Sequence, residues 1–232
     1  MTDNALRGRT RYPGLVNSEL LRFLPTDISD CVLWVAADRI IGLSDNDEVV
    51  NWTDLSDAAN DLLQATAGTK PLYKTGVLSG KPVVRFDGTN DVLRSANNQN
   101  LKTIIAVAVY ADAGNYPNYK GLVGYYVAGI VDLLMMHSGA TILFTGSTMY
   151  NNLWVNGTKT NDTAPINSWH TIAGISTNTY AGYRISVGDD DAGNAARFWK
   201  GDIAEIISYN RIITDTERVA LQNYLKGKYG HY

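Results

Sequence analysis

The sequence predicts an all-β fold, a sandwich of two antiparallel sheets with one C-terminal α-helix. The chain of 232 residues holds 19 Asp but only 4 Glu, together with 20 Asn, 20 Thr, 21 Gly and 14 Tyr. Turns favour Asn, Asp and Gly and strands favour Thr and Tyr, whereas helical surfaces favour Glu, Lys and Ala. From residue 31 onward, short β-rich runs alternate with turn clusters, as in sandwich proteins.

Residues 1–30 differ from the rest and are predicted to form an N-terminal extension, ahead of one domain at 31–232. Up to residue 25 the extension carries four Arg against Asp3 and Glu19, which gives +2, whereas the remaining residues carry −5. A basic arm ahead of an acidic domain can dock on another molecule, and the alternative is a strap packed along its own domain. The attachment residues that we expect are Arg7, Arg9, Arg11, Leu20, Leu21, Arg22 and Phe23.

The strands are expected where apolar, β-branched runs end in turn clusters. The run 103–111 does not alternate between apolar and polar residues, which predicts a central strand covered on both faces. Asn156-Gly157 supplies the two positive φ angles of a type I′ turn, so 153–160 is predicted to be a hairpin. The other expected strands are 31–36, 81–86, 169–176, 183–187 and 202–209.

One helix is expected at the end of the chain, lying over the sandwich. Thr214 and Glu217 form a capping box, in which each side chain satisfies a main-chain N–H of the other. Gly227 stands where a left-handed C-cap would end the helix. The predicted apolar face consists of Ala220, Leu221, Tyr224 and Leu225.

Two stretches of sequence carry a resemblance to a known family. The first contains LWVAAD at 33–38, WTDLS at 52–56 and GKPVVRFDGTND at 80–91, and the second begins with GDIAEIISYNR at 201–211. Together they resemble the concanavalin A-like lectin/glucanase superfamily, specifically the laminin-G-like jelly rolls of phage and bacterial surface proteins. The resemblance spans residues 31–230 and implies a jelly-roll sandwich with its termini close together. Because this fold serves lectins, hydrolases, adhesins and virion proteins, function has to be argued from sites.

No enzyme is expected from the residues that carry chemistry. Glycanases of this fold need two carboxylates on one strand face, two residues apart. Asp202 and Glu205 are three residues apart, which predicts that they lie on opposite faces of a strand. His170 is expected to make a structural hydrogen bond, and Cys31 to pack as a small hydrophobe.

Aromatic and amide side chains in loops are the candidates for glycan binding. A sugar needs a flat aromatic face for its apolar side and planar polar groups for its hydroxyls. The alternative is that these loops are plain surface turns. Trp34, Trp52 and Trp169 are assigned to the core. The candidate ligand-binding residues are Tyr116, Asn118, Tyr119, Tyr150, Asn151, Asn152 and Tyr180.

The densest group of carboxylates is Asp189, Asp190 and Asp191. Calcium prefers six to eight oxygen ligands, which acidic loops can supply. The alternative is an exposed turn rich in Asp that binds no ion. Calcium is therefore a possible cofactor of this loop, and the sequence gives no sign that any cofactor is required.

Charge and hydropathy restrict the partners. A net charge of −3 and a pI near 5.6 argue against nucleic acid. No run reaches the roughly 18 apolar residues of a membrane span, and residues 1–4 do not begin a signal peptide.

From these observations together we expect a non-enzymatic module made in the host cytoplasm and assembled, as a homo-oligomer, onto a phage virion. There it would serve as capsid decoration or as a head or tail fibre, bound to other virion proteins through the arm and displaying its jelly roll to host-surface glycans. The alternatives are a glycan-active hydrolase or lyase and a fragment of a bacterial adhesin.

Overall fold

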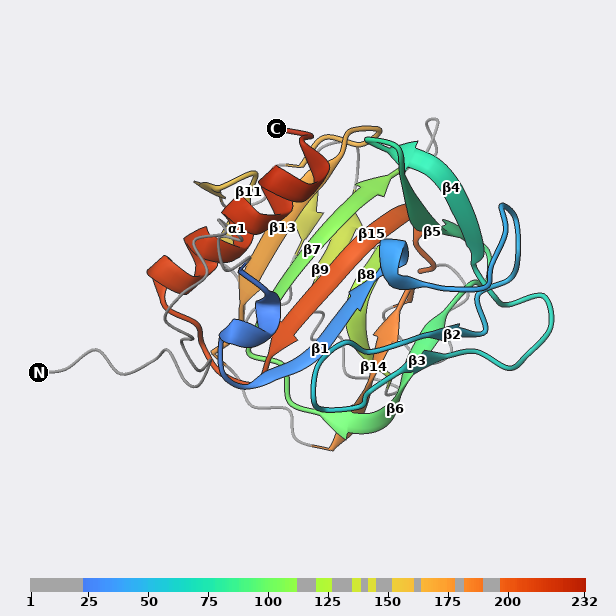
Figure 1. Ribbon diagram of the computed structural model, residues 1–232, viewed down its shortest axis with the longest axis horizontal. Coiled ribbons are helices and arrows are strands. Elements are labelled where there is room, and N and C mark those ends of the chain that lie inside the picture. The colour runs from blue at the N-terminus through green and yellow to red at the C-terminus, as the bar shows by residue number, and fades with distance from the viewer. Residues whose placement is uncertain are drawn as a thin grey trace, which may run out of the picture.

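The fold is a sandwich of two antiparallel sheets with a helix on one outer face (Figure 1). The computed structural model describes residues 23–111, 120–126, 135–138, 142–144, 152–160, 164–177, 182–189 and 197–232. Within these ranges, the prediction of a mostly β chain with two antiparallel sheets and one C-terminal α-helix is confirmed.

The first sheet has the strand order β12-β11-β13-β7-β15-β5-β4, and β1 also pairs with β15. The long strand β15 pairs with two strands along one edge: its first residues pair with β5, and its last residues pair with β1. The bounds are β1 Cys31–Ala36, β4 Leu72–Leu78, β5 Lys81–Asp87, β7 Thr103–Tyr110, β11 Leu153–Val155, β12 Thr158–Thr160, β13 His170–Ile175 and β15 Lys200–Tyr209.

The second sheet has the strand order β10-β9-β8-β14-β6-β3-β2. In its middle, β14 pairs with β8 on one side and with β6 on the other, and a bulge interrupts the pairing with β6 between Arg184 and Ser186. The bounds are β2 Asn51–Trp52, β3 Leu62–Leu63, β6 Leu93–Gln99, β8 Lys120–Tyr126, β9 Met135–Ser138, β10 Ile142–Phe144 and β14 Tyr183–Val187.

Strand β7 explains why the molecule has two apolar cores. All eight of its residues are buried, as the run without alternation predicted. Ile104 and Ala106 point into the core between the two sheets, whereas Ile105 and Val107 point to the opposite face, into a second core under the helix. Trp52 is fully buried between the sheets, Trp34 lies under the helix, and Trp169 is half-buried beside it.

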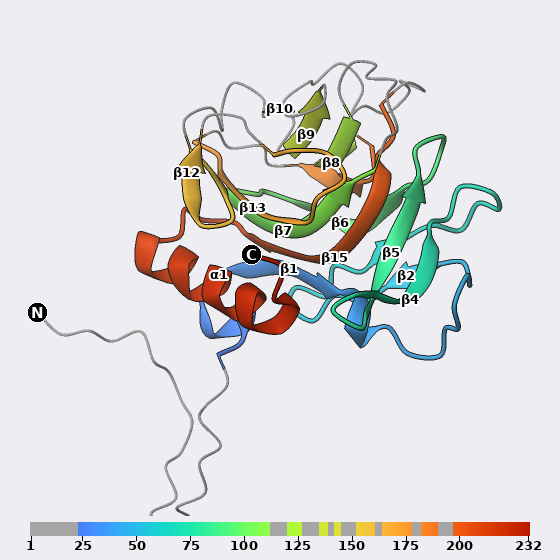
Figure 2. The ribbon, with the colours of Figure 1, turned by 90° about the horizontal axis from the view of Figure 1, so that it is seen from above.

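The helix α1, Asp215–Tyr229, covers the outer face of the first sheet (Figure 2). Its capping box is confirmed, because Glu217 N–H donates to the Thr214 hydroxyl at 3.2 Å and the Glu217 carboxylate accepts from Thr214 N–H at 2.8 Å. Of the predicted apolar face, Leu221 and Leu225 have no exposed surface, whereas Ala220 and Tyr224 are half-buried. No helix in the described part of the chain combines the length and the apolar character that crossing a membrane requires.

The predicted end of the helix at Gly227 is wrong. The helix continues through Gly227, and the left-handed residue that ends it is Gly230, with φ 60°. The extra turn buries Tyr229 against the first sheet, and this burial offsets the roughly 1 kcal/mol that an interior glycine costs. At the predicted hairpin, by contrast, Asn156 and Gly157 have φ angles of 51° and 83°, and β11 pairs with β12 as expected.

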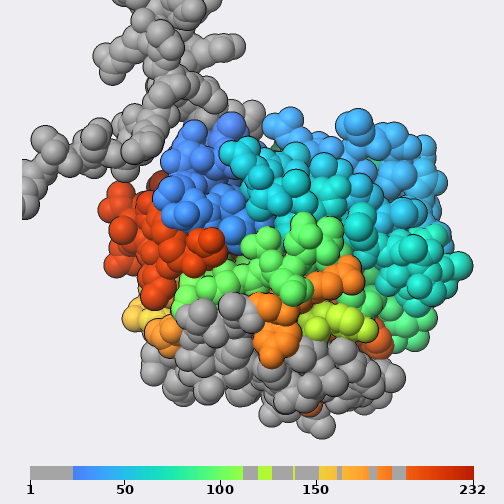
Figure 3. Space-filling view, turned by 90° about the horizontal axis from the view of Figure 1, so that it is seen from below, coloured from blue at the N-terminus to red at the C-terminus, as the bar shows by residue number. Residues whose placement is uncertain are grey.

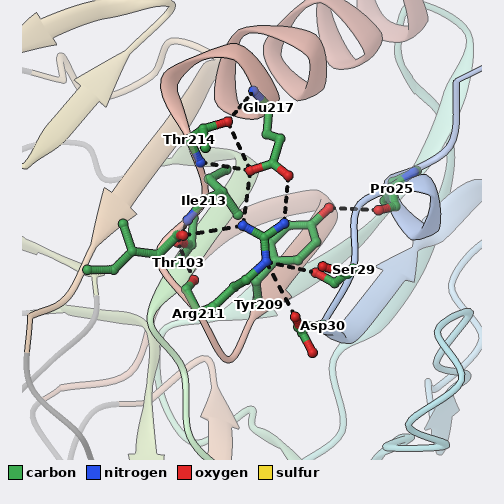
Figure 4. A network of polar contacts seen from close by, with 10 residues as sticks. Pro25, Ser29, Asp30, Thr103, Tyr209, Arg211, Ile213, Thr214 and Glu217 are labelled. Carbon is green, nitrogen blue, oxygen red and sulfur yellow. Dashed lines mark hydrogen bonds and ion pairs between the residues drawn. The ribbon is translucent and has the colours of Figure 1, made fainter. Parts of the chain in front are cut away.

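Residues 23–30 lie against the sandwich and the helix. Tyr209 OH donates to Pro25 O at 2.8 Å, and Phe23 makes an edge-on ring contact with Tyr224 of α1. Arg211 joins both parts, because it makes an ion pair with Asp30 and donates two hydrogen bonds to the Glu217 carboxylate, at 3.0 and 2.6 Å (Figure 4). The chain entering β1 is therefore fastened to the start of α1.

Candidate functional site

Most of the loop residues predicted to bind a glycan lie outside the described residues: Tyr116, Asn118, Tyr119, Tyr150, Asn151 and Tyr180. Asn152 is described and half-buried. Its carbonyl oxygen accepts a hydrogen bond from Ile175 N–H at 3.0 Å, which joins it to β13 of the first sheet. The glycan-binding role of this set stays a prediction.

Of the predicted calcium ligands, only Asp189 is described, and it already has partners. The residue is 3% exposed, and its carboxylate accepts hydrogen bonds from Arg94 at 3.0 Å and from the Ser186 hydroxyl at 3.1 Å. Asp190 and Asp191 lie outside the described residues, and within those residues no three His, Cys, Asp or Glu side chains gather as a metal site. Calcium binding also stays a prediction.

The attachment arm is described only at its end. Arg7, Arg9, Arg11, Leu20, Leu21 and Arg22 lie outside the described residues, whereas Phe23 packs under the helix. Phe23 is therefore an anchor between the extension and the sandwich, and its ring is engaged with Tyr224 rather than offered to a partner.

The prediction that Asp202 and Glu205 lie on opposite faces of their strand is wrong. Opposite β7, Ile203 pairs with Ala108 and Glu205 pairs with Val107, so Ala204 is an extra residue in a β-bulge. A bulge inserts one residue and thereby reverses the alternation beyond it. Both carboxylates consequently lie on the outer face of the first sheet, the face that α1 covers.

Each of these two carboxylates is occupied by the protein itself. Asp202 accepts hydrogen bonds from Arg85 at 2.6 and 2.8 Å. Glu205 has no exposed surface and accepts four hydrogen bonds, at 2.7 to 3.0 Å. The donors are Trp34 Nε1, Tyr224 OH, Lys228 Nζ and Tyr229 OH. Because Lys228 also contacts Asp38 at 2.7 Å, this group, which we call the Glu205 cluster, ties the end of α1 to the first sheet.

His170 and Cys31 have structural surroundings, as predicted. His170 Nε2 lies 2.8 Å from Pro165 O, and burial lowers the pKa of its ring below the usual value. Burial raises the pKa of the Cys31 thiol to about 12, which keeps it protonated and a poor nucleophile at neutral pH.

The outer face of the second sheet has a different character. Tyr125 and Ile185 point into the core, so their neighbours Tyr126 and Arg184 point outward. Tyr126 pairs with Arg184, and Arg184 pairs with Asn98 on the next strand. These three side chains, which we call the outer row, bring an aromatic ring, a guanidinium and an amide together across β8, β14 and β6.

Most polar groups of the outer row have no hydrogen-bond partner among the described residues. Arg184 donates one hydrogen bond, from Nε to Ser95 O at 2.5 Å. In the described part of the chain, its terminal nitrogens, the Tyr126 hydroxyl and the Asn98 amide make no hydrogen bond. Tyr126 is 41% exposed and Asn98 is exposed. Atoms of these three strands reach the surface together in the view from below, in yellow-green, orange and green (Figure 3).

Two neighbouring contacts hold the outer row in place. The Arg94 guanidinium lies 4.0 Å from the centre of the Tyr126 ring, and its other end is fixed by the buried Asp189 carboxylate. On the opposite side, Asn60 accepts a hydrogen bond from Asn97 N–H at 3.1 Å and so fixes the bulged part of β6 next to Asn98. The Tyr126 ring and the β6 main chain beside Asn98 are therefore each held by a contact with another segment of the protein.

A surface pocket of about 390 Å³ lies elsewhere, beside the segment that joins β1 to β2. Its walls are mainly aliphatic, and the glutamate on its rim, Glu48, is paired with Lys70 at 2.7 Å. It lacks an aromatic face, so it suits a sugar less well than the outer row does. The lining residues are Arg39, Ile40, Ile41, Leu43, Glu48, Val50, Asn51, Thr53 and Leu55.

Sequence reasoning missed the outer row because its members are far apart in the chain, at positions 98, 126 and 184. The sequence signal is weak: in β14 the polar residues Arg184 and Ser186 alternate with the apolar residues Ile185 and Val187. Only the pairing of three strands shows that a tyrosine and an asparagine stand beside this arginine.

No family model matches the chain, and no curated protein matches its sequence. Among solved structures, the sialidase of Trypanosoma rangeli in complex with the inhibitor DANA is 11% identical with a TM-score of 0.50, and the match covers 83% of this chain and 32% of that chain. The same sialidase in complex with 2,3-difluoro-KDN is 12% identical with a TM-score of 0.50, covering 86% and 33%. The chain thus spans about a third of the length of the sialidase, and the likeness concerns the fold alone.

Proposed function

We propose that this protein is a non-catalytic module that recognises glycans through the outer row. The observation that carries the proposal is that Tyr126, Arg184 and Asn98 stand side by side with polar groups that make no hydrogen bond to any described residue. Neighbouring strands are about 4.8 Å apart, so the three side chains can contact one small ligand. An aromatic ring beside planar polar groups is the combination that a sugar requires.

Pre-organisation supports the same proposal. The Arg94 contact fixes the tyrosine ring before a ligand arrives, and Asp189 fixes Arg94 in turn. A site held by such a supporting layer loses little side-chain entropy on binding, which favours affinity.

A binding role rather than hydrolysis is supported by the engagement of Asp202 and Glu205. A glycosidase needs a carboxylate pair that faces the scissile bond. Here one carboxylate is held by Arg85 and the other is enclosed in the Glu205 cluster. The rival function, a glycan-active hydrolase or lyase, predicts new reducing ends when the protein is incubated with a glycan that it binds. We expect none.

The proposal places this module on a phage particle, in several copies, as capsid decoration or a head or tail fibre held by residues 1–22. The charge contrast between the basic extension and the acidic remainder supports this placement. A chain that begins at Phe23 keeps its ring contact with Tyr224, so we expect it to melt like the full chain and to bind glycans equally. It should no longer co-sediment with purified particles. Co-sedimentation that persists would contradict attachment through this extension.

The test of glycan recognition is a glycan array probed with three proteins: the parent, Tyr126→Ala, and the control Val219→Ala on the exposed side of α1. Loss of the stacked ring should weaken binding by about tenfold or more, which corresponds to about 1.4 kcal/mol. The control should bind like the parent. Equal binding by Tyr126→Ala, or no glycan bound by the parent, would overturn the proposal.

A further inference from the structure

Arg184, like the exposed Arg39, differs from other described arginines in its charge compensation. Four of them have a carboxylate oxygen within 3.1 Å: Arg85 with Asp202, Arg94 with Asp189, Arg211 with Glu217 and Arg218 with Asp215. Among the described residues, the Arg184 side chain makes a hydrogen bond only to the main-chain oxygen of Ser95. Its positive charge is therefore not neutralised by a carboxylate in the described part of the chain, although the protein as a whole is acidic.

The hydrogen bond of Arg184 uses only one of the three guanidinium nitrogens. The hydrogen bond from Nε fixes the guanidinium over β6, and the two terminal nitrogens remain for a ligand. A planar guanidinium presents parallel N–H groups at the spacing of the two oxygens of a carboxylate, which makes bidentate pairing the preferred mode. The side chain is half-buried on its sheet, and partial removal from water strengthens such a pair.

The groups beside Arg184 suit the rest of a sugar. Tyr126 offers a ring face on one side, and the Asn98 amide offers both a donor and an acceptor on the other. The nearby Arg94 is already neutralised by Asp189, so the row presents one uncompensated positive charge rather than a basic patch. This arrangement suits a single carboxylate and not the repeated phosphates of a nucleic acid.

We propose that the ligand of the outer row is an acidic glycan, whose sugar carboxylate pairs with Arg184 while its ring lies against Tyr126. This inference rests on the proposed function, since it names the class of glycan that the same surface would take.

The experiment compares each acidic glycan with its carboxyl-reduced neutral form, for example oligogalacturonate and the galactan obtained from it by carboxyl reduction. The parent should bind the acidic member at least tenfold more tightly, and added salt should reduce that preference. Arg184→Gln should bind both members equally, and Arg184→Lys should keep only part of the preference. The matched control is Arg39→Gln, which removes the same charge from an exposed arginine that has no carboxylate partner among the described residues.

The outcomes separate the two proposals. If the parent binds both members equally and Tyr126→Ala loses both, the protein recognises glycans but the acidic class is wrong. A preference for acidic glycans that Arg39→Gln also abolishes would overturn the role of Arg184, as would a preference for sulfated over carboxylated glycans. Failure to bind any member of any pair would overturn both proposals.

Discussion

The outer faces of the two sheets differ in whether their polar side chains are buried and hydrogen-bonded within the described residues. On the first sheet, Glu205 is fully buried and all four of its hydrogen-bond positions are filled, with α1 lying over it. On the second sheet, Tyr126 and Arg184 lie at the surface with donors that no described residue accepts. A buried polar group is tolerated only when it is satisfied, whereas an exposed and unsatisfied group costs nothing and remains available to a ligand. The comparison assigns the first face to stability and supports the recognition role that we propose for the second.

The largest effect is expected in the Glu205 cluster. Glu205→Ala leaves the Lys228 ammonium buried with one carboxylate instead of two, and removal of one partner from a buried pair costs about 3–5 kcal/mol. The matched control is Glu48→Ala, whose ion pair with Lys70 is half-exposed and should contribute at most about 1 kcal/mol. Guanidinium unfolding measures both. Equal losses of stability in the two variants would show that the cluster is not the tie that we describe.

A somewhat smaller effect is expected where α1 packs on the first sheet. Leu221 is completely buried, so Leu221→Ala should lower the free energy of unfolding by about 2–4 kcal/mol. Val219 on the same helix is 44% exposed, and Val219→Ala should change stability by less than about 0.5 kcal/mol. Thermal melts that coincide for the two variants would contradict the packing of the helix.

The sequence allowed the architecture to be predicted because its signals are local. The capping box of Thr214 and Glu217, the hairpin at Asn156-Gly157 and the doubly buried run of β7 each depend on neighbouring residues. The bulge at Ala204 and the helix end at Gly230 could not be predicted in this way. A bulge depends on pairing with β7, and the last helical turn depends on burial of Tyr229 against a distant strand.

The outer row illustrates the same limit for function. Loop aromatics can be recognised in a sequence, but a binding surface made from three paired strands depends on their register. A shift of one residue in β14 would turn Arg184 into the core and Ile185 toward solvent. The register is visible only when the core neighbours Tyr125 and Ile185 have been located.

A smaller and pH-dependent effect distinguishes the half-buried His231 from the buried Asp91. Burial and the nearby His170 lower the pKa of His231 from 6.5 to about 4, so its contribution to stability is complete above pH 6.5 and is lost as the pH falls toward 4. Burial raises the pKa of Asp91 from 3.8 to about 6, so this group acts in the opposite direction and favours the folded state as the pH falls from 6 to 3.8.

Melting temperatures between pH 7 and pH 4 test these signs. His231→Asn should flatten the acid-induced decrease relative to the parent, and Asp91→Asn should steepen it. The same direction of change in both variants would contradict the assignment.

The most direct test of the contrast between the two faces is a map of main-chain amide shifts by NMR during titration with a glycan that the protein binds. The account predicts that the largest shifts lie on the outer face of the second sheet, around Asn98, Tyr126 and Arg184, while the amides around Glu205 and Lys228 stay unchanged. Shifts concentrated at the pocket beside Ile41 and Val50, or at the Glu205 cluster, would contradict it.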